Sequence, residues 1–214
     1  MSVTLHGAAY SVYVRIVRLA LAEKGVAHDH EEVDIFAAGG PPPEHLVRHP
    51  FGKIPTLSHD GFTLFETAAI CRYIDEAFDG PPLLPRDARG RARAAQVIGL
   101  LDAYGYRAMV WDVYVQLAGD AAQEGTTDPA VVERGLARSE TVLDVLERFG
   151  AEGHVLGGER ITLADLHAAP MLAYFMATAP GREAVAARPH LAARVAAMRQ
   201  RPTVSDTRPA EAAW

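Results

Sequence analysis

The hydrophobic pattern of this 214-residue chain changes character once, near residue 79. Before that point, short strand-like runs alternate with helix-like runs, and after it a helical pattern continues almost unbroken to about residue 201. The segment between the two patterns, DGPPLLPRDA at residues 79–88, holds three prolines and a glycine, a composition typical of a domain linker. We therefore expect an α/β domain at residues 1–79, a linker at 80–88 and an all-α helical domain at 89–214.

The first part of the chain predicts the element order β-α-β followed by β-β-α. VTLHG predicts a short strand, VRIVRLALAEKG a helix that ends at Gly25, and HDHEEVDI a polar edge strand. IPTLSHDGFTLFE then holds two strand-like runs joined through Asp60 and Gly61, which is a hairpin signal. TAAICRYIDEAF completes this part with the pattern of an amphipathic helix.

Pro55 stands at the mouth of a predicted strand, in the stretch HPFGKIPTL at residues 49–57. Proline has no amide hydrogen, so within sheets it is confined to first residues, edges and bulges. A proline at this position leaves the backbone of its neighbour without a partner in the sheet. We therefore expect free main-chain groups here that are available to a ligand.

Charge and the N-terminal sequence exclude two classes of protein. The formal net charge of −6 gives no basic footprint for nucleic acid. The opening MSVTLH lacks the pattern of a secretory signal, and no run of about 18 apolar residues suited to a membrane span occurs. We therefore expect a cytoplasmic protein that binds neither nucleic acid nor membrane.

Cysteine and histidine spacings predict no metal or disulfide centre. Cys71 is the only cysteine, so neither a disulfide within the chain nor a CxxC pair can form, and its place on an apolar helix face favours a structural role. The pairs His28/His30 and His45/His49 permit two metal ligands each, but no third ligand is evident. These histidines are expected to face solvent.

Glycines and capping signals punctuate the helical part. Its first long helix carries Gly99 and Gly105, each costing roughly 1 kcal/mol relative to alanine, which indicates close packing or a bend. In ITLADL, Thr162 is a predicted N-cap and Asp165 stands three residues later, where its carboxylate can reach back to the cap. The tail TRPAEAAW is expected to be loosely held.

Three motifs carry a resemblance to a known family: YSVYVRIVRLALAEKGV at the first turn and helix, HPFGKIPTL at the proline, and LFETAAICRYIDEAF at the third helix. In this order and at these spacings they resemble the cytosolic glutathione S-transferase superfamily over nearly the whole chain, and within it the serine-type members of the phi, tau and zeta kind. The resemblance implies a thioredoxin-like N-terminal domain that binds glutathione and an all-helical C-terminal domain that shapes the site for a small hydrophobic electrophile.

The resemblance also implies a glutathione site in the first domain. It implies that the bond before Pro55 is cis and that Ile54 offers its backbone to the cysteinyl group of glutathione, like an added antiparallel strand. Glu66 and Thr67 open the third helix, where free amides and the helix dipole favour the γ-glutamyl carboxylate. Lys53 is expected to reach the glycyl carboxylate. Core packing, helix capping and simple solvation are the structural alternatives for these residues.

Ser11 is the predicted catalytic residue, with Tyr10 as the fallback donor. The family places a tyrosine, serine or cysteine beside the glutathione sulfur just after the first strand, and Ser11 aligns there with the serine of the serine-type members. A hydroxyl that donates to the sulfur favours the thiolate, which is the attacking species. Ser11 also stands where the first helix begins, so an N-cap is its structural alternative. A thiol oxidoreductase is not expected, because no cysteine occupies this position.

The sequence departs from the family near the expected second helix. Gly39 and Gly40 stand where plant-type members have a basic residue that helps to hold the glycyl carboxylate, so weaker glutathione binding is expected. His45 is the nearest substitute, although a solvent-facing role is preferred. His49 stands where relatives usually have asparagine.

Two further sets of residues have alternatives that stay open. Residues at roughly helical spacing in YGYRAMVWDVY are candidates for the electrophile pocket, although such a stripe is more often part of a core; they are Tyr106, Met109, Val110 and Val113. Phe51 matches a position where some classes insert an aromatic side chain into the partner subunit, which implies a homodimer, and local packing is the alternative.

The function expected from the resemblance is transfer of glutathione to small electrophiles, with the thiolate activated by a serine hydroxyl. A serine hydrolase is not expected, because the G-x-S-x-G elbow is absent. A glutathione-dependent isomerase of a small unsaturated acid, and a noncatalytic ligand-binding or interaction protein, stay open as alternatives. The residues do not identify the electrophile.

Overall fold

The computed structural model describes residues 2–157, 160–209 and 214. The chain divides into two compact units, Met1–Leu83 and Leu84–Trp214, and the division falls inside the segment that the sequence predicts to be a linker. No helix in the described part of the chain is both long enough and apolar enough to cross a membrane.

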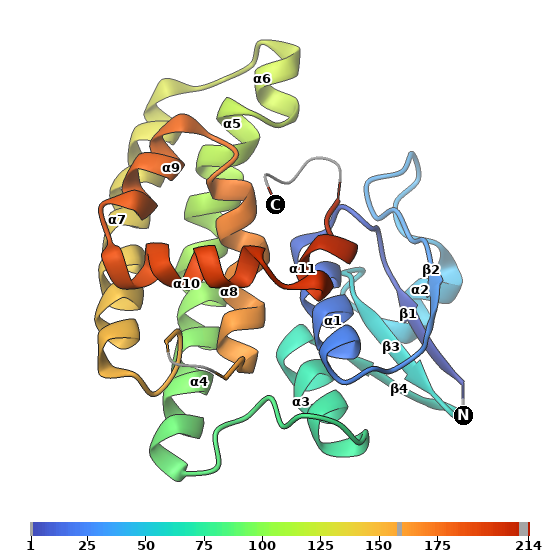
Figure 1. Cartoon of the computed structure of the whole chain (residues 1–214). Helices are drawn as coiled ribbons and strands as arrows, with labels where there is room; N and C mark the ends of the chain where they lie inside the picture. Colours follow the sequence, from blue (N-terminus) through green and yellow to red (C-terminus); the bar gives the residue numbers. More distant parts are fainter. Residues whose placement is uncertain (1, 158–159, 210–213) are drawn as a thin grey trace. The chain divides into compact units, whose positions relative to one another are not determined.

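The first unit is a four-stranded mixed sheet with helices on both faces (Figure 1). The strand order is β2-β1-β3-β4, with β2 parallel to β1 and β3 antiparallel to both of its neighbours. Helices α1 and α3 pack together on one face, and α2 lies on the other. This is the thioredoxin-like fold that the sequence predicts. Its elements are β1 (Val3–His6), α1 (Val12–Glu23), β2 (Asp29–Glu31), α2 (Pro43–Arg48), β3 (Thr56–His59), β4 (Phe62–Phe65) and α3 (Thr67–Ala77).

A buried ion pair connects the two packed helices of this unit. Lys24, at the C-terminal end of α1, places its Nζ 3.3 Å from Asp75 Oδ1 on α3. The same carboxylate oxygen accepts a hydrogen bond of 2.7 Å from the backbone N–H of Leu83. Since a buried charge is tolerated only when it is paired and hydrogen-bonded, this contact holds the end of the unit against its core.

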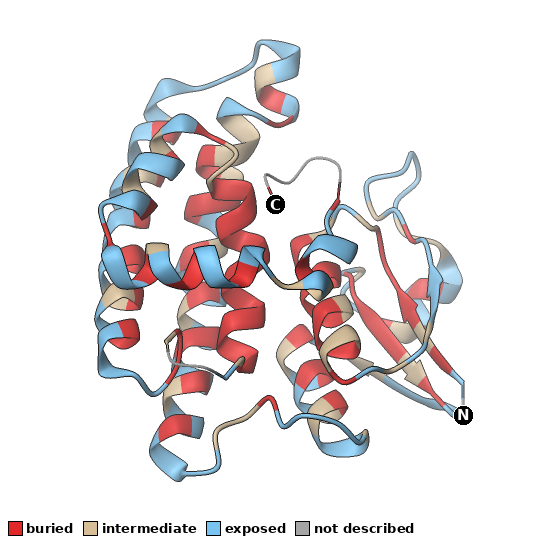
Figure 2. Ribbon diagram, in the orientation of Figure 1, coloured by how far each residue is buried: buried red, intermediate tan, exposed pale blue. Residues whose placement is uncertain are grey.

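The second unit is all helical, as the sequence predicts. Helix α8 is buried along its whole length, with α4, η2 and α9 among the helices packed on it (Figure 2). The elements are α4 (Ala88–Leu100), η1 (Leu101–Gly105), η2 (Arg107–Tyr114), α5 (Val115–Leu117), α6 (Asp120–Glu124), α7 (Pro129–Glu152), α8 (Leu163–Phe175), α9 (Ala179–Ala186), α10 (Pro189–Arg199) and α11 (Pro202–Asp206).

The two glycines of the first long helix have different surroundings. A Cβ on Gly105 would lie 3.1 Å from Leu101 Cδ2 and 3.6 Å from Val142 Cγ1 on α7, so close packing explains this glycine. A Cβ on Gly99 would meet no atom within 4 Å, so the packing explanation is wrong there. The helix becomes π-helical from Leu101 onward, which is the irregularity that follows Gly99.

The predicted start of α8 is confirmed. Asp165 Oδ2 accepts hydrogen bonds from the backbone N–H of Thr162 at 2.8 Å and from its hydroxyl at 2.7 Å. The other carboxylate oxygen accepts from Arg194 Nε of α10 at 2.7 Å. Asp165 therefore also connects α10 to the start of the buried helix.

The C-terminal end is held more firmly than the sequence predicts. Residues 210–213 of the predicted loose tail lie outside the described residues. Thr207 and Trp214 are 5% and 6% exposed, and Trp214 lies among residues of α8 and α10 that include Leu172 and Leu191. The expectation of a loosely held tail is therefore wrong at these two residues, because the indole finds an apolar site.

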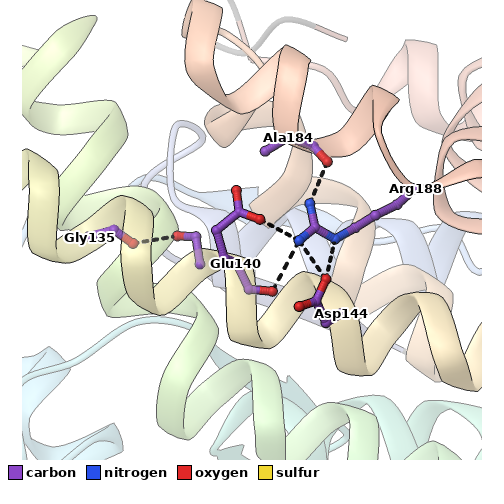
Figure 3. Close-up of polar contacts among 6 residues, drawn as sticks. Gly135, Glu140, Asp144, Ala184 and Arg188 are labelled. Atoms are coloured by element: carbon purple, nitrogen blue, oxygen red, sulfur yellow. Dashed lines mark hydrogen bonds and ion pairs between the residues drawn. The ribbon is translucent and has the colours of Figure 1, made fainter.

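Arg188, the N-cap residue of α10, connects this helix to α7 and α9 (Figure 3). Its guanidinium donates to the backbone oxygen of Ala184 on α9 at 2.6 Å and to the Asp144 carboxylate on α7 at 2.6 and 2.9 Å. It also donates to the backbone oxygen and the carboxylate of Glu140. The arginine side chain is 8% exposed, whereas the two carboxylates are more than half exposed.

Replacing Arg188 with methionine should lower the free energy of unfolding by about 2 kcal/mol. Two main-chain oxygens then lose their hydrogen-bond donor, and two carboxylates lose the guanidinium with which they pair. Chemical denaturation followed by circular dichroism measures this change. Arg182→Met is the control: among the described residues, exposed Arg182 donates only to the carbonyls of Met176 and Ala177, so this substitution should cost less than about 1 kcal/mol. Equal losses in the two variants would contradict the role of Arg188.

His167 is a fully buried histidine on α8. Its Nδ1 lies 3.2 Å from the backbone oxygen of Leu163, and its Nε2 is buried with no hydrogen-bond partner in the described part of the chain. Burial lowers the pKa of His167 from 6.5 to about 4, and the bond to Leu163 offsets this only in part. The folded protein therefore holds this imidazole neutral.

Because the unfolded chain binds a proton at His167 first as the pH falls, stability is lost between about pH 6.5 and pH 4. The loss from this one residue should be about 3 kcal/mol. His167→Asn keeps a donor near Nδ1 but cannot titrate, so its unfolding free energy should fall less steeply over this range in urea titrations. His154→Asn, a variant at an exposed histidine, should show the wild-type dependence of stability on pH. If the stability of His167→Asn fell as steeply with pH as that of the wild type, the role of His167 would be refuted.

Candidate functional site

Strand register gathers three distant segments at one end of the sheet. His6 pairs with Thr56, and Thr56 pairs with Phe65. Because both pairings are antiparallel, the residues just beyond these pairs also face one another along the sheet: Gly7 after β1, Pro55 before β3 and Glu66 after β4. Hairpin geometry and one crossover thus bring the predicted ligand-binding residues together.

The peptide before β3 supplies free backbone groups. The Ile54–Pro55 bond is cis, and both residues are buried. No residue of the described chain hydrogen-bonds to the backbone N–H or C=O of Ile54. The side chain of Lys53 is exposed, and no ion pair to it is present in the described ranges. The segment can therefore accept an extended ligand along its main chain.

The start of α3 has the character of an anion site. Glu66 stands before the helix with φ 71° and ψ 110°, and no side chain caps the first amides of α3. A positive φ is a strained conformation for a glutamate, and such strain is concentrated at functional sites. Thr67 is 7% exposed and Glu66 is exposed. Free amides at the positive end of the helix dipole favour a carboxylate.

Ser11 is both the N-cap of α1 and a free donor. Its Oγ accepts a hydrogen bond of 3.4 Å from the backbone N–H of Val14, and its own N–H donates to Ala8 O at 3.0 Å. The Ser11 hydroxyl hydrogen makes no hydrogen bond to a described residue, and the side chain is only half-buried. A serine hydroxyl has one donor and two acceptor positions, so capping leaves its donor available.

The Tyr10 hydroxyl already has a hydrogen-bond partner, the carboxylate of Asp34. The phenolic oxygen donates to Asp34 Oδ1 at 3.3 Å, and the side chain is 39% exposed. The same Asp34 oxygen accepts the backbone N–H of Phe36 at 2.9 Å. The tyrosine therefore stabilises the loop after β2 in this structure.

Gly7 connects the start of α1 to the segment before Pro55. It has φ +151°, and a Cβ there would lie 2.5 Å from Val14 Cγ2 and 3.2 Å from Ile54 Cβ. Val14 is the residue whose amide is capped by Ser11. The absence of a side chain at Gly7 thus lets the first turn of α1 approach Ile54. Sequence reasoning missed this role, although a glycine directly after the first strand was its signal.

His45 and His49 are buried, so the expectation that they face solvent is wrong. His45 has no exposed surface, and its Nε2 lies 2.7 Å from the backbone oxygen of Lys53. His49 is 3% exposed and packs its ring 4.7 Å from the ring of Phe65. Neither contact has a signal in local sequence, because each joins α2 to another segment.

The other expectations on histidine and cysteine have mixed outcomes. His30 is exposed, yet its Nε2 lies 2.7 Å from the backbone oxygen of Gly7, and His28 is half-buried beside Val26 O. No cluster of three metal-ligating side chains is found in the part of the chain that the structure describes. Cys71 is buried and forms no disulfide, as predicted.

The four candidates for the electrophile pocket lie on the π-helical part of the second unit or just before it. Met109, Val110 and Val113 are buried, and Val113 Cγ2 lies 3.0 Å from where a Cβ on Gly135 of α7 would stand. Tyr106 keeps some exposed surface, and burial raises the pKa of its phenol. This burial is typical of core positions, and their role in a pocket stays a prediction.

Phe51 is 73% exposed in the first unit. Its ring makes edge contacts with His49 at 6.2 Å and with Phe65 at 6.3 Å. An aromatic ring with most of its surface exposed is suited to a partner, and the homodimer stays a prediction.

Family models match both units. The model described as glutathione S-transferase, N-terminal domain, matches residues 5–82, and the model described as glutathione S-transferase, C-terminal domain, matches residues 129–193.

Named relatives match nearly the whole chain. Glutathione S-transferase 3 of Zea mays is 34% identical over 205 residues, covering 95% of this chain and 91% of that protein. Glutathione S-transferase F13 of Arabidopsis thaliana is 33% identical over 180 residues, covering 83% and 82%. The solved structure of glutathione S-transferase III in apo form has a TM-score of 0.84 at 33% identity, covering 97% and 95%. That of glutathione S-transferase-I bound with lactoylglutathione has a TM-score of 0.83 at 29% identity, covering 97% and 98%.

Gly7→Ala should lower the free energy of unfolding by about 3 kcal/mol, because the added methyl group overlaps Val14 and Ile54. Urea titration followed by circular dichroism measures this loss. Gly25→Ala is the matched control, since Gly25 has φ +68° but no atom within 4 Å of a Cβ. It should cost only the backbone penalty of about 1 kcal/mol. If Gly7→Ala cost no more than this control, the close approach would be refuted.

Proposed function

We infer that this chain, which belongs to the glutathione S-transferase family, is a glutathione transferase that uses the Ser11 hydroxyl to hold the glutathione sulfur as a thiolate. One observation carries the serine assignment. Ser11 Oγ accepts the Val14 amide at the start of α1 and keeps its hydrogen free to donate. The named relatives, at about one-third identity, support the transferase activity.

Glutathione is proposed to lie along the sheet end that the register assembles. Its cysteinyl main chain would pair with the free backbone groups of Ile54, and its γ-glutamyl carboxylate would bind the uncapped amides at Thr67. The exposed carboxylate of Glu66 suits the γ-glutamyl ammonium group, and the exposed Lys53 suits the glycyl carboxylate. A related structure at 29% identity was solved with lactoylglutathione, which supports a glutathione-type ligand on this fold.

The required change in thiol acidity matches what Ser11 can supply. A thiol of pKa about 8.5 must shift by about two units, or roughly 2.7 kcal/mol, to be mostly thiolate at neutral pH. A hydrogen bond to a charged group contributes about 1.5 to 3 kcal/mol, and the N-terminus of α1 adds about 0.3 to 1. No general base is needed for this step.

The thiolate then attacks the electrophilic carbon of a second substrate. With a halide-bearing ring, a carbon–sulfur bond forms, the carbon–halogen bond breaks, and the halide leaves with the electron pair. Tyr106 is proposed to contact the electrophile, because it keeps exposed surface. The buried Met109, Val110 and Val113 are proposed to pack beneath the electrophile pocket. Binding both substrates together replaces an encounter in solution by an oriented attack.

Phe51 is proposed as the contact of a two-fold homodimer, in which its exposed ring would be covered by the partner subunit. A cytoplasmic location is proposed together with the use of glutathione as substrate.

Ser11→Ala should retain glutathione binding but lower kcat/KM at pH 7 by about 10- to 100-fold, because the bound thiol loses its donor. Part of this loss should be recovered at higher pH, where the thiol ionises unaided. Calorimetry measures glutathione binding. The rate of conjugation with a halonitrobenzene, measured from pH 6 to 9, gives kcat/KM. The substitution also removes an N-cap worth about 1 kcal/mol, so folding is checked by circular dichroism.

Tyr10→Phe is the control for the neighbouring hydroxyl. It removes the bond to Asp34 but leaves Ser11 in place, so kcat/KM should stay within about twofold of wild type. Full activity in Ser11→Ala with loss in Tyr10→Phe would move the role to Tyr10.

Absence of glutathione binding at millimolar concentration in the wild type would overturn the enzyme assignment. Assays with epoxides, peroxides and a maleylpyruvate-like acid separate conjugation from the other glutathione-dependent reactions.

A further inference from the structure

We propose that His45 and His49 are positioning residues of the glutathione site: His45 holds the peptide before Ile54 through a hydrogen bond, and His49 supports the turn at Glu66 while its imidazole is neutral. The proposal rests on the glutathione site inferred above. It adds two residues that touch neither the reacting atoms nor, by this assignment, the ligand.

His45 orients the peptide group that the ligand would meet. Its Nε2 lies 2.7 Å from the backbone oxygen of Lys53, so the ring carries its hydrogen on Nε2 and donates it to that carbonyl. The carbonyl of Lys53 and the N–H of Ile54 belong to one planar peptide group. A hydrogen bond that fixes the carbonyl therefore fixes the direction of the Ile54 N–H, which has no partner among the described residues.

His49 supports the other side of the site. It ends α2, where its backbone N–H donates to His45 O at 2.8 Å, so the two rings belong to one turn. The His49 ring lies 4.7 Å from the Phe65 ring at an interplanar angle of 37°. Phe65 immediately precedes Glu66, whose φ of 71° needs support from its surroundings. The ring contact supplies that support from α2.

The surroundings of the two rings disfavour a positive charge. The ring centroids of His45 and His49 are 6.3 Å apart, and the Nδ1 atom of each is buried without a hydrogen-bond partner in the described ranges. Burial lowers the pKa of His49; Glu66 opposes this effect, and His45 and Lys53 add to it. A proton on the His49 ring would place a charge beside its apolar contact with Phe65 and next to the other histidine.

A third histidine lies in the same cluster and carries further charges with it. His6 on β1 is 2% exposed, with Nδ1 2.7 Å from Glu31 Oε2 and Nε2 3.2 Å from Ser58 Oγ. Burial and then Arg48 lower the pKa of His6, whereas Glu31 raises it, and His45 adds a small lowering. The charged groups that act on His49 are therefore Glu66 and Lys53, and His6, beside His45, is in turn acted on by Arg48 and Glu31.

The first test separates positioning from simple core packing. His45→Phe keeps a ring but loses the donor to Lys53, whereas His45→Gln keeps an N–H that can reach the same carbonyl. At pH 7.5, His45→Phe should raise the KM and Kd for glutathione about five- to tenfold while kcat at saturating glutathione stays within twofold. His45→Gln should restore both constants to within about twofold of wild type. Unchanged glutathione affinity in His45→Phe, or no rescue in His45→Gln, would overturn the assignment.

The second test uses pH and a ligand without an ionisable sulfur. S-methylglutathione binding is measured by calorimetry between pH 7.5 and 5.5, which removes the thiol from the pH dependence. Wild-type affinity should fall about five- to tenfold towards pH 5.5, and His49→Phe, which keeps the ring contact but cannot titrate, should lose less than threefold. The exposed histidine variant His154→Asn should follow wild type.

The outcomes distinguish this inference from the proposed function. If the wild type fails to bind either glutathione or S-methylglutathione at pH 7.5, the proposed function fails. If the wild type binds S-methylglutathione equally well at both pH values, or if His49→Phe keeps the full wild-type pH dependence, only the role of the neutral His49 ring fails.

Discussion

The antiparallel register of β3 with both β1 and β4 is the constraint on which the rest of the first unit depends. It aligns Gly7, Pro55 and Glu66 at one end of the sheet, although they are far apart in sequence. A slip by one residue would turn every side chain of β3 to the other face. Buried Leu5 and Leu57, paired across the register, make such a slip unfavourable, so the same apolar contacts that stabilise the sheet also assemble the site.

In the proposed glutathione site, two helix termini would provide the chemistry, and their end groups are satisfied differently. At α1, Ser11 caps the helix and still has a hydrogen to donate. At α3, no side chain of the N-cap residue caps the first amides, and that residue, Glu66, has a positive φ of 71°. One terminus is thus capped internally and would supply a donor in the proposed site, and the other would bind a ligand's carboxylate. The second unit shows the contrasting structural use, where Asp165 and Thr162 satisfy the start of α8 completely enough for it to be buried.

Much of the fold and part of the site could be predicted from sequence, because their signals are local. Strand and helix periodicity, the proline-bearing linker and the Thr162–Asp165 box each depend on residues within a few positions of one another. The roles of His45, His49 and Trp214 could not be predicted in this way. Each is buried by segments distant in the chain, and a histidine beside polar neighbours gives no local signal that a carbonyl such as that of Lys53 will be brought to it.

By itself the sequence determined the two-part architecture and the residue types at the helix termini and at Pro55, since these follow from backbone preference and short-range hydrogen bonding. Only the tertiary structure decided which of these groups are free. Among the described residues, the Ser11 hydroxyl hydrogen and the backbone N–H and C=O of Ile54 have no hydrogen-bond partner. The Tyr10 hydroxyl, in contrast, donates to Asp34. The physical reason is that a donor or acceptor is available to a ligand only when no long-range neighbour satisfies it, and long-range neighbours are chosen by packing.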